Sequence, residues 1–273
     1  MHIRTWMANH PILSYIILTI VWSFGWWSCL FFFMEPGGLM KAPPIAFLFV
    51  LLGGFGPALS GLFTTRLIHG KEGVKSLWDR FRIGRVGTWW FALLVIPAVT
   101  ALTPLARWLS GYTVDTAAMI NLVLPGIGLG LIAGLMEEIG WRGFLLPHLL
   151  KRHSPLKATL LLGLVWGGLW HGYADYFGLG GRGLTSLILI FLLGPILLTA
   201  WSFIITLVYE RTQGSLLIAF FMHASLSSSA LIFGQTYASA SEEIIWTAIS
   251  TGLAVLAAAL IWLFIRRPVP QNY

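Results

Sequence analysis

Three ionisable residues, Glu137, Glu138 and Arg142, lie in the otherwise apolar stretch GLMEEIGWRGFLL at residues 134–146. A charged side chain in hydrocarbon costs at least ~2.5–3.5 kcal/mol, so each of them needs a physical reason to be there. Residues four apart share one face of a helix, which places Glu138 to pair with Arg142. Glu137 has Trp141 at that spacing instead of a cation. Glu137 is therefore the carboxyl group left to take and return a proton, as a general base does.

Two of the seven histidines, His171 and His223, also fall within apolar stretches. A turn centred near Ser154 has Glu137 17 residues before it and His171 17 residues after it. At a rise of ~1.5 Å per residue, two antiparallel helices joined at this turn bring both side chains to equal depth. We therefore expect Glu137 to contact His171. His223 has Ser227 one helical turn further on, which predicts a polar inner face on that helix.

Either histidine alone would be typical of a hydrogen bond between packed helices. Together with the two glutamates and the arginine they favour a functional site, because ionisable residues inside a membrane are functional by default. A second acidic pair, Glu242 and Glu243, has a different interpretation. Ser239 and Glu242 have the spacing of a capping box, so this pair is expected to begin a helix.

The composition predicts an all-α fold, a polytopic bundle of transmembrane helices in the lipid bilayer. Of the 273 residues, 57% are hydrophobic and 10% are charged, and the mean hydropathy is +0.82. A soluble domain usually carries about a quarter charged residues. We expect a single integral membrane domain over residues 1–273. About eight stretches are long and apolar enough to span a bilayer: 12–34, 45–68, 88–109, 117–150, 155–172, 185–208, 214–233 and 243–265.

The basic charge of the chain is interpreted as a cytoplasmic membrane face. A net charge of +7 is also found in proteins that bind nucleic acid, but the distribution favours a membrane protein with no nucleic-acid partner. With both termini inside, 14 of the 17 Lys and Arg residues fall in inner segments, or 13 if Arg142 is counted within the membrane, as the positive-inside rule requires. The polar segment at 67–88 is expected to be either an amphipathic helix on the inner leaflet or a solvated loop. The three Lys and Arg residues that fall in outer segments are Lys41, Arg107 and Arg182.

The buried ionisable residues resemble the three motifs of the CPBP (or ABI) family of intramembrane proteases, which includes type II CAAX prenyl endopeptidases and bacteriocin-processing proteins. The family's Glu-Glu-x-x-x-Arg is present as EEIGWR at 137–142. Its Phe-x-x-x-His corresponds to GGLWH at 167–171, with Gly167 in place of Phe and either Trp166 or Trp170 to fill the space. Its His-x-x-x-Asn/Asp corresponds to HASLS at 223–227, which ends in Ser227. The resemblance covers residues 45–233.

This resemblance implies a catalytic centre in a helical core with a cavity that reaches the glutamate. Glu137 would activate a water molecule that attacks a peptide carbonyl, and His171 would assist. His223 and Ser227 would stabilise the oxyanion. The substrate would be a membrane-bound peptide or a prenylated protein of the CAAX type.

The same resemblance assigns structural support of the site to Glu138 and Arg142. No cofactor is expected, and a glutamate mechanism without metal is favoured. Zinc is the alternative, because two histidines and a carboxylate are a workable zinc set. In that case the metal ligands would be Glu137, His171 and His223.

Two other functions are compatible with the same polar core. One is a non-catalytic membrane protein for binding or immunity. The other is a proton-coupled transporter in which Glu137 and His171 relay protons, although no internal repeat is evident. In each case we expect an integral protein of a prokaryotic cell membrane with both termini cytoplasmic.

Overall fold

The computed structural model describes residues 2–33, 42–179 and 184–265, and this part of the chain is almost wholly helical and contains no strand. Six of its helices are long and apolar enough to cross a membrane. They coincide with six of the eight predicted stretches. The other two predicted stretches are the shorter helix α13 (Leu216–Ile232) and the helical segment that starts at Pro155. The prediction of an all-α polytopic membrane bundle is confirmed, with eight as an approximate number of spans.

The spans are assembled from α-helices joined by short 3₁₀ and π-helical turns. The 3₁₀ segments are Cys29–Phe33, Ile83–Arg85 and Gly87–Leu94, and the π-helical turns are Trp141–Leu145, Leu164–Trp170 and Leu189–Leu193. The α-helices are α1 (His2–Asn9), α2 (Pro11–Ser28), α3 (Pro44–Gly54), α4 (Gly56–Asp79), α5 (Val95–Leu109), α6 (Thr116–Asn121), α7 (Val123–Gly140), α8 (Leu146–Leu150), α9 (Pro155–Gly163), α10 (His171–Leu179), α11 (Leu184–Ile188), α12 (Gly194–Arg211), α13 and α14 (Ala240–Ile265).

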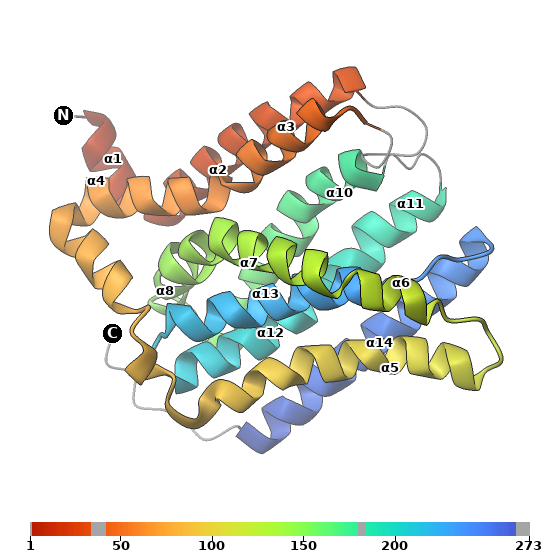
Figure 1. Ribbon diagram of the computed structural model, residues 1–273. Helices are drawn as coiled ribbons and strands as arrows, with labels where there is room; N and C mark the ends of the chain where they lie inside the picture. Colours follow the sequence, from red (N-terminus) through yellow and green to blue (C-terminus); the bar gives the residue numbers. More distant parts are fainter. Residues whose placement is uncertain (1, 34–41, 180–183, 266–273) are drawn as a thin grey trace.

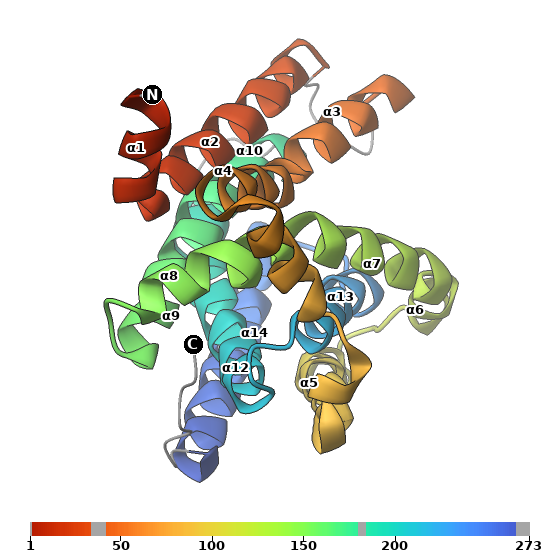
Figure 2. The same cartoon turned by 90° about the vertical axis from the view of Figure 1, so that its left-hand side faces the viewer.

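Helices α7 and α13 form the centre of the bundle and lie side by side (Figures 1 and 2). Their close approach depends on small residues, since a Cβ atom at Gly130 of α7 would lie 2.3 Å from the carbonyl oxygen of Ala224 on α13. Close backbone approach through glycine is the usual means of packing helices in lipid. On one side of this pair α4 packs on α7, with α2 against α4, and on the other side α5 and α12 pack on α13, with α14 against both.

Helix α4 combines the predicted second span with part of the polar segment at 67–88. Its axis changes at Gly70, whose φ of 68° is a left-handed conformation that glycine adopts without steric cost. The helix then continues to Asp79, so the first part of this segment is helical. Its Leu77 is buried whereas Glu72 and Lys75 are exposed, as expected for an amphipathic helix. In Figure 1 the end of α4, the turn between α8 and α9, and the start of α13 lie at one end of the bundle. These are segments predicted to be cytoplasmic, and that location stays a prediction.

A buried cation connects α5 to α14 at the opposite end of the bundle. Arg107 was expected in an outer segment, but it is only 3% exposed and forms an ion pair of 2.7 Å with Glu242. Its guanidinium also lies 5.0–5.3 Å from the ring centres of Tyr112, Tyr237 and Trp246. Desolvated cation–π contacts of this kind are worth about 2 kcal/mol. The cluster therefore fixes the connection that precedes α14 to the last turn of α5.

Glu242 lies in the first turn of α14, as the capping-box spacing predicted. Its backbone N–H donates to the Ser239 hydroxyl at 3.2 Å. Its carboxylate, however, accepts from the backbone N–H of Ala238 at 2.9 Å and from Arg107. The residue thus caps the helix and also partners the buried cation, which the spacing alone did not predict.

Candidate active site

Three segments that are distant in the sequence bring their ionisable side chains together in the interior. Glu137 lies near the end of α7 and is 4% exposed, while His223 of α13 is 1% exposed. His171 begins α10, and its side chain is 24% exposed. Glu137 Oε2 is 3.9 Å from His171 Nε2, and Glu137 Oε1 is 3.5 Å from His223 Nε2. The contact predicted from equal depth in a helical hairpin is therefore present, and His223 joins it from a third helix.

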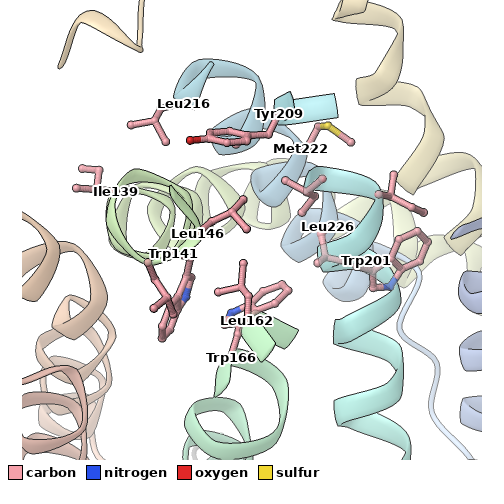
Figure 3. Close-up of a cluster of buried hydrophobic side chains, with 14 of the residues drawn as sticks. Ile139, Trp141, Leu146, Leu162, Trp166, Trp201, Tyr209, Leu216, Met222 and Leu226 are labelled. Atoms are coloured by element: carbon pink, nitrogen blue, oxygen red, sulfur yellow. The ribbon is translucent and has the colours of Figure 1, made fainter. Parts of the chain in front are cut away.

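Two tryptophans hold one oxygen of the Glu137 carboxyl group. The indole nitrogens of Trp166 and Trp141 donate to Glu137 Oε2 at 2.6 Å and 3.1 Å. Both rings are fully buried, and Figure 3 shows their nitrogens turned toward the same space between the helical turns that carry the two tryptophans. With Oε2 held by two donors, Oε1 is the oxygen that faces His223. From its spacing, Trp141 was expected only to leave Glu137 without a cation at i+4. Its N–H group was the signal available in the sequence for this hydrogen bond.

Glu138 connects His223 to Arg142. Glu138 Oε1 lies 2.6 Å from both Arg142 Nη1 and His223 Nδ1, and Glu138 and Arg142 are fully buried. The predicted pair at i and i+4 is therefore confirmed. Because His223 Nδ1 is engaged by Glu138, its Nε2 is directed at Glu137. Arg142 also donates to the Ser202 hydroxyl at 2.9 Å and stacks over the Trp166 ring at 5.1 Å. These contacts satisfy part of the buried ion pair, because Glu138 Oε2 and Arg142 Nε are buried without a hydrogen-bond partner among the described residues.

The π-helical turn Trp141–Leu145 is held from outside by α4 and α12. A π turn leaves backbone carbonyl groups without their usual helical partners. Arg80, at the end of α4, donates to the carbonyl oxygens of Arg142 and Gly143 at 2.7 Å and 2.9 Å. The Tyr209 hydroxyl of α12 donates to the same Arg142 carbonyl at 3.0 Å. Sequence reasoning treated Arg80 only as one of the basic residues of an inner segment. The contact could not be found from spacing, because 62 residues separate the partners.

Gly167 has a steric reason to replace the phenylalanine of the family motif. A Cβ atom there would lie 2.9 Å from Leu198 Cβ and 3.3 Å from Pro195 Cα, both on α12. Of the two tryptophans expected to fill the missing space, Trp166 reaches Glu137. Trp170 instead donates to the Ser23 hydroxyl on α2 at 2.9 Å.

Ser227 lies one turn after His223 on α13 and is half-buried. The Ser227 hydroxyl has no hydrogen-bond partner among the described residues. The structure therefore places Ser227 on the same helix face as His223, and its role at an oxyanion stays a prediction.

The arrangement of Glu137, His171 and His223 does not fit a metal ion shared by all three. Within the described residues, no group of three or more His, Cys, Asp or Glu side chains is placed to hold one. The Glu137 oxygen that faces His171 is already engaged by two indole N–H donors.

The fold and this centre define an integral membrane protein: a helical bundle with a Glu–His–Glu–Arg network in its interior. A family model described as type II CAAX prenyl endopeptidase Rce1-like matches residues 119–229, a segment that contains all three motifs. A relative named CAAX prenyl protease 2, from Methanococcus maripaludis, is 44% identical over 48 residues. That alignment spans 18% of this chain and 17% of the relative. These matches cover less than half of the chain, and they support its resemblance to the CPBP family of intramembrane proteases.

Proposed function

We propose that this protein is an intramembrane endopeptidase in which Glu137 activates the attacking water. The observation that carries the proposal is the Glu137 carboxyl group, buried against His171 and His223 with one oxygen held by two indoles. This arrangement leaves Oε1 as the proton acceptor and fixes its direction. A base held in one orientation in a water-poor interior has the pre-organisation that general-base catalysis needs.

The proposed reaction consumes one water molecule for each peptide bond. Glu137 Oε1 takes a proton from water while the water oxygen bonds to the carbonyl carbon. The carbonyl oxygen becomes an oxyanion, to which the Ser227 hydroxyl donates together with Nε2 of a His223 ring that carries hydrogen on both nitrogens, its Nδ1–H being held by Glu138. The carbon–nitrogen bond then breaks as the proton passes to the leaving nitrogen, with His171 assisting. The products are a carboxylic acid and an amine. One well-placed donor to an oxyanion is worth about 2.7–4 kcal/mol.

The substrate is proposed to be a membrane-associated peptide, with a prenylated CAAX peptide as the first candidate. The name of the Methanococcus maripaludis relative suggests this choice. The Glu137 carboxyl group lies within a helix of membrane-spanning length, which suits a substrate that is itself associated with the membrane. We further propose a prokaryotic cell membrane with both termini cytoplasmic. Protease accessibility of terminal tags in intact and opened cells tests that orientation.

The test is cleavage of quenched membrane peptides, prenylated and not prenylated, by the purified protein in lipid. We expect Glu137→Gln to abolish cleavage and Glu72→Gln, an exposed residue of the polar end of α4, to leave it unchanged. A zinc chelator is expected to leave the rate unchanged, and loss of cleavage that added zinc restores would contradict the metal-free mechanism.

The same preparation distinguishes the other functions. A wild-type protein that is folded and cleaves no peptide of a broad library would refute the protease and favour a binding or immunity role. Substrate-driven proton flux into liposomes, abolished by Glu137→Gln, would favour the transporter.

A further inference from the structure

His171 lies between two carboxyl groups, one on each of its ring nitrogens. Its Nε2 is 3.9 Å from Glu137 Oε2, and its Nδ1 is 3.6 Å from Asp175 Oδ1. Asp175 is one turn further along α10, at the i+4 position that shares a helix face with His171. The exposed fraction of the side chain rises along this row, from 5% for Glu137 to 24% for His171 and 43% for Asp175. The row thus leads from the buried centre to the surface of the protein.

We propose that Asp175 is a positioning residue for His171. Its carboxylate attracts the ring hydrogen to Nδ1, so that the lone pair of neutral His171 is on Nε2, the nitrogen facing Glu137. A histidine with its other nitrogen held by a carboxylate has a defined tautomer and ring orientation. This inference rests on the proposed function, in which His171 assists proton transfer at the scissile bond.

The surroundings of Asp175 support this role over that of an ordinary surface carboxylate. In the described part of the chain, His171 is the only basic side chain within ion-pair distance of Asp175. Other acidic residues have stronger partners: Asp79 pairs with Arg82 at 2.8 Å, and Glu242 pairs with Arg107. The edges of Trp166 and Trp170 flank the His171 ring, with centroids 5.6 Å and 5.0 Å away, and limit how it can turn. A modest energetic preference for hydrogen on Nδ1 is therefore enough to fix the tautomer and orientation of the His171 ring.

The kinetic test compares Asp175→Asn with Asp175→Glu and with Asp79→Asn. Asp79 is the matched control because its side chain is similarly exposed, at 38%, and its partner lies away from the site. For a metal-bound histidine, loss of the partner on its other ring nitrogen typically costs about 10- to 100-fold in metal affinity or activity, and we take the same scale for His171. We expect Asp175→Asn to lower kcat by at least about tenfold, with KM unchanged within about twofold because Asp175 acts through His171. Asp175→Glu retains the carboxylate and should recover most of the rate. A wild-type kcat in the Asp175→Asn variant overturns the inference.

A spectroscopic test does not depend on activity or on a folded variant of Asp175. Nitrogen-15 NMR of wild-type protein labelled at histidine reports which ring nitrogen carries hydrogen, and the His171→Gln variant identifies the signal. We expect hydrogen on Nδ1 of His171 in the wild type. Hydrogen on Nε2 alone overturns the inference. If the wild type cleaves no peptide but this signal is as expected, the proposed function fails while the placement of His171 by Asp175 holds.

Discussion

Replacing Trp166 by phenylalanine tests whether the indole N–H group is what positions the general base. The substitution keeps a buried aromatic ring and removes the 2.6 Å hydrogen bond to Glu137 Oε2. Trp141 is then the one remaining indole donor, at 3.1 Å. The carboxyl group loses the shorter of its two fixed contacts and gains freedom to rotate away from His223.

The expected magnitude follows from the strength of that bond. A hydrogen bond to a charged group contributes about 1.5–3 kcal/mol. Each 1.36 kcal/mol of lost transition-state stabilisation is tenfold in rate, so the full loss predicts a fall in kcat/KM of about 10- to 150-fold. Trp141→Phe removes the longer bond and should cost less.

Trp170→Phe is the matched control for the change in packing. Trp170 lies on the same helical segment, is 3% exposed, and donates at 2.9 Å to the neutral Ser23 hydroxyl rather than to the glutamate. Initial rates on a quenched membrane peptide give kcat/KM for wild type and both variants, and thermal unfolding in detergent reports their stability. If Trp166→Phe and Trp170→Phe lower kcat/KM equally, the indole donor has no special part in positioning Glu137 and the reasoning is refuted.

Three further predictions concern stability, measured as denaturant or thermal unfolding in detergent. Glu138→Gln leaves Arg142 as a buried charge without its anion and should lower the free energy of unfolding by about 3–5 kcal/mol. The double variant with Arg142→Met should recover at least half of that loss, and a double variant no more stable than Glu138→Gln would contradict this. Gly140→Ala should cost about 1–3 kcal/mol, because its Cβ would lie 2.2 Å from a backbone oxygen of α4. Gly25→Ala, with nothing within 4 Å, should cost nothing, and equal costs at both positions would be evidence against the close α4–α7 contact. Arg107→Met removes the cation that joins α5 to α14 and should lower the unfolding temperature, and an unchanged temperature would show that this cluster is not stabilising.

The sequence by itself determined the features that depend on neighbours along one helix or on one short turn. Composition and span length predicted the membrane bundle. The i and i+4 spacing predicted the Glu138–Arg142 pair, because helix periodicity is a local property of the backbone. Equal distances from Ser154 predicted the contact of Glu137 with His171, because two helices that leave the same turn rise equally with each residue. Residue types in these positions were also enough to indicate the resemblance to the CPBP family.

Only the tertiary structure decided how segments joined by long connections meet. His223 could not be placed by hairpin counting, since its position depends on how closely the glycines of α7 allow α13 to approach. The hydrogen bonds of Trp166 to Glu137 and of Arg80 to the π turn depend on side-chain directions across different helices. Burial of Arg107 likewise arises where α5, α14 and their connections converge. Such contacts result from packing of the whole bundle, in which the position of each helix is fixed by several others at once. Residue spacing along one helix therefore does not predict them.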